Sequence, residues 1–172
     1  MNWRDRIDKN SSREKQVFIR AGIAALLILA ADQLTKWYFF RNFIPGQSVE
    51  IIPGIFNFTF VRNLGAAWSI FSGYVWMLLA FGMAAAVAIV VFFRNLAEGC
   101  AERYYALLLI LSGIAGNTFD RAYHGAVIDF IHLHYENIWH YPVFNVADMA
   151  ICTGVAIYLL SGFLRKELPK EK

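Results

Sequence analysis

The sequence predicts an all-α membrane protein with a small extracytoplasmic β-hairpin, and two observations carry that prediction. Hydrophobic residues make up 58% of the 172 residues and charged residues only 17%, a more apolar composition than that of ordinary soluble domains. Four segments also approach the length of about 20 apolar residues that a membrane-crossing helix requires; they span residues 18–40, 73–93, 103–119 and 144–164. We expect a single domain, residues 1–172, whose main solvent is the bilayer.

The placement of basic residues predicts the orientation of the four helices. Basic residues precede the first helix, flank the link between the second and third, and follow the fourth: Arg4, Arg6, Lys9, Arg13, Lys15, Arg20, Arg94, Arg103, Arg165, Lys166, Lys170 and Lys172. Cytoplasmic loops carry an excess of Lys and Arg. Both termini are therefore expected in the cytoplasm, and the loops 41–72 and 120–143 outside. Basic residues divided among three short flanks do not favour a nucleic-acid partner.

A cleaved signal peptide over residues 1–31 is the alternative interpretation of the basic and then apolar start of the chain. The apolar run continues from Leu34 to Phe40, which makes it too long for the core of a typical signal peptide. Cleavage would also leave an odd number of crossings and disturb the charge asymmetry. We therefore expect the first helix to be retained.

The first outer loop contains a pattern typical of a β-hairpin. Phe56, Phe58 and Phe60 alternate with polar residues, and Pro53-Gly54 before them supplies a turn. The hairpin is expected over residues 49–61. Its apolar face can pack on lipid or on the helices.

The second outer loop is rich in aromatic and imidazole rings, namely Tyr123, His124, His132, His134, Tyr135, Trp139, His140 and Tyr141. Amphipathic rings favour the headgroup layer, so we interpret this group as an interfacial belt. A metal site made of His132, His134 and Asp129 is the alternative. The spacing matches no compact metal-binding motif, so no metal and no other cofactor is expected.

Polar residues of three helices are expected at one depth, just inside the outer surface. Asn117 and Asp120 are three residues apart at the outer end of the third helix, and Asn145 and Asp148 repeat that spacing where the fourth helix re-enters. Asp32 lies in the outer half of the first helix. A charged group at membrane depth costs about 2.5 to 3.5 kcal/mol even on lenient scales, so such residues indicate a function.

Each of these residues also has a purely structural interpretation. Asp32 can pair with Lys36 one turn later, Asp120 with Arg121 as an interfacial ion pair, and the two asparagines can join helices. Asp129 can be an exposed loop residue. Only Asp148 resists such an explanation, because it lies inside a helix with no basic residue within a turn.

Asp129 and Asp148 together suggest acid–base chemistry. Two carboxyl groups held close in a partly dry site do not both ionise readily, so the pair shares a proton near neutral pH. The ionised member can activate water for attack on a carbonyl group while the protonated member donates to the carbonyl oxygen, as in aspartic proteases. Such a hydrolysis requires no metal.

Five motifs occur in a fixed order along the chain. They are Asp32-Gln-Leu-Thr-Lys36, Arg62-Asn-Leu-Gly-Ala-Ala-Trp68, Gly116-Asn-Thr-Phe-Asp-Arg121, Val127-Ile-Asp-Phe130 and Phe144-Asn-Val-Ala-Asp148. In order, spacing and helix arrangement the chain resembles the lipoprotein signal peptidase family, also called signal peptidase II, from about residue 20 to 164. Phe119, Trp68 and Leu64 depart from the residues more common in that family, but none of these changes removes a polar position.

The resemblance implies an aspartic endopeptidase of the bacterial cytoplasmic membrane, with its active site near the outer leaflet. It would cut the signal peptide from prolipoproteins just before a diacylglyceryl-modified cysteine. Asp129 and Asp148 match the catalytic dyad, and the residues matching positions that support the dyad, the fold or the substrate are Asp32, Asn63, Asn117, Asp120, Arg121 and Asn145. The resemblance also implies membrane lipids and globomycin-type inhibitors as partners.

Two other classes of function compete with a peptidase. A small transporter subunit would use Asp32, Asp120, Asp129 and Asp148 as a proton or cation relay, but the inner halves of the helices are almost wholly apolar. A membrane assembly factor would use the small residues Gly82, Ala84 and Ala86 as a packing face. It provides no reason for paired carboxylates.

Overall fold

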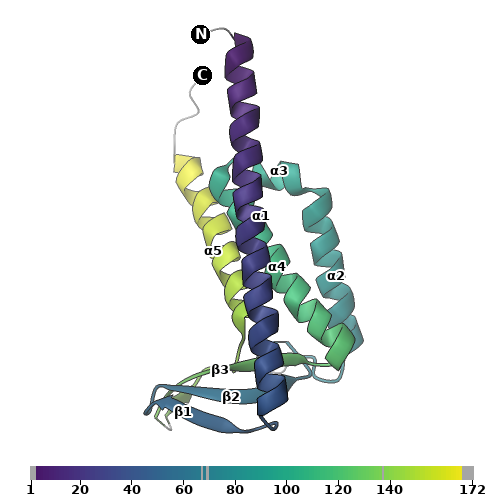
Figure 1. Cartoon of the computed structure of the whole chain (residues 1–172), viewed down its shortest axis with the longest axis vertical. Helices are drawn as coiled ribbons and strands as arrows, with labels where there is room; N and C mark the ends of the chain where they lie inside the picture. Colours follow the sequence, from purple (N-terminus) through teal and green to yellow (C-terminus); the bar gives the residue numbers. More distant parts are fainter. Residues whose placement is uncertain (1–2, 67, 69, 137, 168–172) are drawn as a thin grey trace.

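The protein is a bundle of helices with a β-sheet across one end (Figure 1). The computed structural model describes residues 3–66, 68, 70–136 and 138–167; Ala67, Lys170 and Lys172 of the sequence argument lie outside these residues. The helices are α1 (Trp3–Asn42), α2 (Val75–Val91), α3 (Phe93–Ala97), α4 (Ala101–His124) and α5 (Val146–Glu167), and the strands are β1 (Ser48–Ile52), β2 (Phe56–Asn63), β3 (Val127–Tyr135) and β4 (Trp139–His140).

Helix α4 lies at the centre of the bundle and packs against α5, α1 and α2. It continues five residues beyond the end expected at 119, which places Asp120 and Arg121 on the helix and not in the following loop. Gly125 ends the helix with a φ of 67°, and its N–H donates to the carbonyl of Arg121. A glycine adopts this left-handed conformation without strain, so the helix runs on until that glycine.

Within the described residues, two helices have the length and composition needed to cross a membrane. They are Ser12–Asn42 within α1 and Val146–Arg165 within α5. Val75–Val91 is apolar but shorter, and the expected segment 73–93 is divided between α2 and α3. The start of α1 and the end of α5 lie at the same end of the bundle, away from the sheet (Figure 1). The four crossings and their sidedness remain a prediction.

The predicted hairpin is present as β1 and β2, which pair antiparallel across a turn at Gly54, where φ is 73°. The sheet is larger than expected, because β3 pairs with the other edge of β2 and β4 pairs with β3. The segment interpreted as a loop therefore contributes two of four strands. A segment such as 127–135 becomes a strand only when the free edge of another strand lies beside it. The sequence does not reveal that such an edge is present.

A hydrophobic cluster, mainly aromatic, packs the sheet against the end of α1. Its buried members are Phe39, Phe60, Ile128 and Phe130, and the rings of Phe39 and Phe130 stack with centroids 4.4 Å apart. Since Ile128 and Phe130 flank Asp129 on β3, this packing fixes the position of that aspartate relative to the helices.

Close contact between α4 and α5 depends on Gly113. A Cβ atom added there would collide with the carbonyl oxygen of Ala147 and lie 2.6 Å from Cγ1 of Ile151. Gly113→Ala is therefore expected to lower the free energy of unfolding by about 1 to 3 kcal/mol, the usual cost of overpacking. Thermal unfolding in detergent measures it. Gly22→Ala is the control, because a Cβ there meets nothing within 4 Å; equal stability of the two variants would contradict the contact.

Candidate active site

Asp129 is held on β3 by two asparagine side chains. The residue is almost fully buried, with a relative exposure of 2%. Asn63, at the end of β2, donates to Oδ2 at 2.9 Å, and Asn145 donates to Oδ1 at 2.6 Å. The interpretation of Asp129 as an exposed loop residue is therefore wrong.

Asp148 lies in the first turn of α5, where a reciprocal cap positions it. The backbone N–H of Asp148 donates to Oδ1 of Asn145 at 2.9 Å, and the N–H of Asn145 donates to Oδ2 of Asp148 at 3.2 Å. This is the arrangement of a capping box, with Asn and Asp in the places of the usual Ser and Glu. The three-residue spacing thus begins the helix and aims a carboxylate toward β3.

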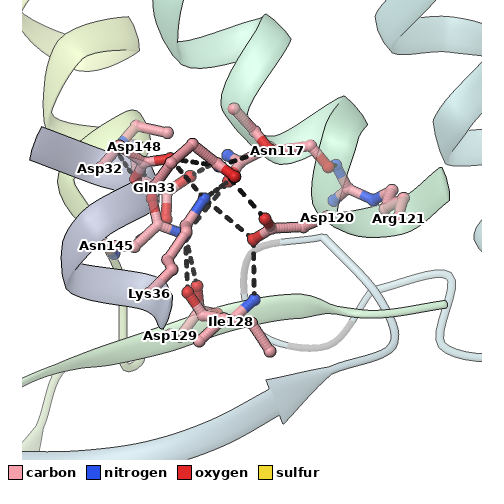
Figure 2. A network of polar contacts seen from close by, with 12 residues as sticks. Asp32, Gln33, Lys36, Asn117, Asp120, Arg121, Ile128, Asp129, Asn145 and Asp148 are labelled. Carbon is pink, nitrogen blue, oxygen red and sulfur yellow. Dashed lines mark hydrogen bonds and ion pairs between the residues drawn. The ribbon is translucent and has the colours of Figure 1, made fainter. Parts of the chain in front are cut away.

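Two asparagines connect the aspartates to each other. Asn117 on α4 donates to Oδ1 of Asp148 at 2.7 Å and accepts at its own Oδ1 from Asn145 at 3.1 Å. The Asn145 amide also donates to Asp129. Asn145 is completely buried, and these contacts make the polar residues of α4, α5 and β3 a single network, as Figure 2 shows.

Lys36 is the central cation of this network, whereas its position in the sequence predicted only a pairing with Asp32. It is buried, and its Nζ lies 2.8 Å from Asp32 and 2.9 Å from Asp120. It also donates to Oδ1 of Asn117 at 3.0 Å (Figure 2). A lysine ammonium only donates, so this contact directs the Asn117 NH₂ group toward Asp148. The spacing from Asp32 was the one available signal for Lys36.

The Lys36 pairing decides between the structural interpretations of the acidic residues. The pairing of Asp32 with Lys36 is confirmed, while the pairing of Asp120 with Arg121 is wrong. Asp32 also accepts from the N–H of Ala147 at 2.8 Å, and Asp120 accepts from the N–H of Ile128 at 3.1 Å. These carboxylates anchor the residues next to Asp148 and Asp129.

Arg121 points to the segment that follows β2. It donates to the carbonyl of Gly65 at 3.1 Å and to that of Asn117 at the longer distance of 3.4 Å. Asn63 accepts from the N–H of Gly65 at 2.9 Å. The segment after β2 is thereby fastened beside the aspartates, and all eight predicted site residues lie in one region of the fold.

A cavity of about 330 Å³ opens onto both aspartates. Asn63, Asn117 and Arg121 supply its polar wall, and its other wall is mainly apolar and is formed by residues of α2, α4, α5 and the flanking loops, including Gly82, Ile114, Ile151, Trp68 and Tyr141. Polar groups therefore meet an apolar groove between helices at this point. The arrangement suits an extended segment with an apolar continuation.

Burial raises the pKa of Asp129 to about 7, and the negative charge of Asp148 acts in the same direction. The hydrogen bonds from Asn63 and Asn145 oppose the rise, because they favour the ionised form. Asp148 is less buried and lies in the first turn of α5. The two carboxyl groups thus lie in different environments.

The alternative metal site is not formed by the residues that the structure describes. Both oxygens of Asp129 accept from asparagines, and the ring of His132 lies against that of His140, with Nε2 and Nδ1 3.3 Å apart. Across the described ranges, no three His, Cys, Asp or Glu side chains are placed to hold one metal ion.

Comparison with known proteins agrees with this site. The sequence model of the signal peptidase (SPase) II family matches residues 24–164. The chain belongs to the signal peptidase II family. It is 42% identical over 140 residues to the lipoprotein signal peptidase of Bacillus subtilis (strain 168), covering 81% of this chain and 90% of that one. It is 37% identical over 142 residues to that of Listeria welshimeri, covering 83% and 92%.

Two solved structures of bacterial membrane enzymes share the fold. The first superposes with a TM-score of 0.82 at 31% identity, covering 89% of this chain and 93% of the other. The second has a TM-score of 0.74 at 33% identity, covering 87% and 94%. As a member of the signal peptidase II family, the chain is a membrane peptidase with a small antiparallel sheet.

Proposed function

We propose that the protein removes the signal peptide of prolipoproteins by aspartic hydrolysis, cutting just before a diacylglyceryl-modified cysteine. The observation that carries this proposal is that Asp129 from β3 and Asp148 from α5 line one cavity and share a single hydrogen-bond network. Family membership supplies the peptidase class. The lipoprotein signal peptidases among its relatives supply the substrate class.

The two environments suggest separate roles for the aspartates. Ionised Asp148 accepts a proton from water as the water oxygen bonds to the scissile carbonyl carbon, and protonated Asp129 donates its proton to the carbonyl oxygen. In the second step the C–N bond breaks, Asp148 returns its proton to the leaving nitrogen, and Asp129 recovers one from the hydroxyl. The dyad then has its initial protonation state, and no covalent intermediate forms.

The cavity walls support an apolar helical substrate that enters from the bilayer. Ile114 on α4 and Ile151 on α5 continue the cavity wall one helical turn from Asn117 and Asp148, and Gly82 on α2 borders the same cavity. A signal peptide is an apolar segment that occupies the membrane. The proposal includes four crossings, cytoplasmic termini, and an active site near the outer leaflet of the cytoplasmic membrane, where water is available; globomycin-type inhibitors would compete for the same cavity.

A cleavage assay with purified protein tests the proposed function. The substrates are one precursor peptide with a diacylglyceryl cysteine and the same peptide without acylation. Cleavage of the acylated precursor just before the cysteine, with much slower cleavage of the other, is the expected result. No cleavage of either precursor by a folded protein would contradict the proposal.

The activity is expected to fall as the pH rises through about 7. Asp129 must be protonated to act as the acid, and its pKa is raised to about 7, so its acid form is lost above that pH. The value of kcat/KM for the acylated precursor should then decrease about tenfold per pH unit. A profile that stays flat from pH 6 to 9 would contradict the assignment.

Asn63→Ala provides a sharper version of this measurement. It removes a hydrogen bond that favours ionised Asp129, so the pKa of Asp129 should rise. The decrease in kcat/KM should then begin at a higher pH. Thr59→Ala on the same strand is the control, because Thr59 contacts Ser48 and His132 instead. A decrease in kcat/KM that begins at a lower pH in Asn63→Ala would contradict the role of that hydrogen bond.

A proton or cation relay has less support from the described side chains. Asp32, Asp120, Asp129 and Asp148 belong to one network at the sheet end of the bundle, and Lys36 neutralises two of them. A relay requires polar groups along the whole crossing. Helix α2 is apolar throughout.

A further inference from the structure

A second cavity, of about 920 Å³, lies at the end of the bundle away from the sheet. Residues of α1, α2, α3 and α4 line it, and α3 crosses that end of the molecule in Figure 1. Helices α1 and α2 each pack on α4, and residues of both helices border this cavity. None of the residues proposed for peptide cleavage borders it.

One wall of this cavity is apolar. It consists of Phe18, Val90, Val91, Leu108 and Leu111. Its aromatic part holds three helices together, because the ring of Phe18 meets Phe93 and Tyr104 edge-on at centroid distances of 5.7 and 6.2 Å. Val90 and Val91 are largely exposed in the protein alone, which makes this wall suitable for hydrocarbon chains.

The rim of the cavity carries two cations, Lys15 on α1 and Arg94 on α3. Among the side chains that the structure describes, neither forms an ion pair, whereas Arg103 and Arg165 at the same end are paired with Glu98 and Glu102.

One acid also borders this cavity. Glu14 places Oε1 3.3 Å from the Cβ position of Gly99, against the turn before α4. Two cations therefore face one carboxylate above an apolar wall.

We propose that this cavity binds one anionic phospholipid, with its phosphate between Lys15 and Arg94 and its chains along the apolar wall between α1 and α2. Basic pockets between membrane helices recognise anionic headgroups in this way. A free phosphate ion would leave the apolar wall uncovered. The basic start of a signal peptide would be repelled by the two rim cations, so the lipid is the occupant with complementary charge and shape.

Native mass spectrometry of the delipidated full-length protein tests this inference. The probes are phosphatidylglycerol, phosphatidylcholine with matched chains, and inorganic phosphate. One phosphatidylglycerol is expected to bind more tightly than phosphatidylcholine, and inorganic phosphate should neither bind nor displace it. Basic residues near an anionic surface contribute about 1 kcal/mol each, so Lys15→Ala with Arg94→Ala should weaken phosphatidylglycerol binding by about 30-fold.

Arg13→Ala with Arg20→Ala is the matched control. These are exposed basic residues of the same part of α1 that do not line the cavity, so this variant should bind phosphatidylglycerol as the unchanged protein does. A third variant, Leu111→Trp, places a larger side chain in the apolar part of the cavity. It should weaken phosphatidylglycerol binding without a change in charge. Equal affinity for both lipids, equal losses in the two charge variants, or displacement by phosphate would overturn the proposal. Peptide cleavage is not measured, so failure here leaves the peptidase assignment unaffected.

Discussion

Asp148→Asn is expected to reduce cleavage of an acylated precursor by about 10³-fold or more, the upper range for loss of a general base. The amide cannot accept a proton from water at neutral pH. It also retains only one oxygen for the donors Asn117 and Asn145, which both bond the carboxylate. Asp129→Asn should have a similarly large effect, because an amide at that position has no acidic proton to donate to the carbonyl oxygen. Single-turnover cleavage of the acylated precursor measures both losses.

The two variants should also behave as one unit. Combining Asp129→Asn with Asp148→Asn is expected to lower the rate little beyond either single change, because groups that act in the same step are not additive. Glu136→Gln removes an exposed carboxylate that follows β3 and should leave the rate unchanged. Each variant must retain its thermal unfolding transition. Cleavage within tenfold of the unchanged rate in a folded Asp148→Asn protein would refute the dyad.

Lys36→Met is expected to lower the free energy of unfolding by about 3 to 5 kcal/mol, the usual cost of leaving buried charges without their partner. The side chain of Lys36 is only 3% exposed, and its ammonium contacts both Asp32 and Asp120 within 3 Å. Methionine has nearly the same shape, so the effect reports the charge and not a cavity. Chemical or thermal unfolding in detergent measures the loss.

A rescue variant separates charge from packing. Adding Asp32→Asn and Asp120→Asn to Lys36→Met removes the two unpaired carboxylates, while each new amide keeps an oxygen for the backbone N–H of Ala147 or Ile128. The triple variant should recover most of the lost stability. Arg20→Met, an exposed basic position on the same helix, should change little. A loss in Lys36→Met no larger than that in Arg20→Met would contradict the buried ion network.

Much of the candidate site was predictable because its residues carry local signals. Asn145 and Asp148 are three residues apart, a spacing that predicted a shared helix face, and in the structure the two residues form the cap of that helix. Asp32 and Lys36 are one helical turn apart, so their pairing follows from helix geometry. The alternation of Phe56, Phe58 and Phe60 likewise predicted the strand β2.

The remaining part of the site required contacts between distant segments. Lys36 meets Asp120 and Asn117 only because α1 packs against α4, and no spacing along the chain indicates that meeting. The third helix was expected to end at 119, and Arg121 was considered as the partner of Asp120, whereas the helix continues to His124 and Asp120 contacts Lys36.

The sequence by itself determined that this is a membrane protein, because its apolar composition is visible without a structure. It also singled out the two aspartates, because charge is costly in lipid and because the motifs that contain them occur in a fixed order. Only the tertiary structure decided how Asp129 reaches its partner. Its segment becomes β3 because β2 presents a free edge, and Phe39 of α1 packs on Phe130 to hold that strand beneath the helices. A strand depends on a neighbour far away in the sequence, whereas a helix closes its own hydrogen bonds.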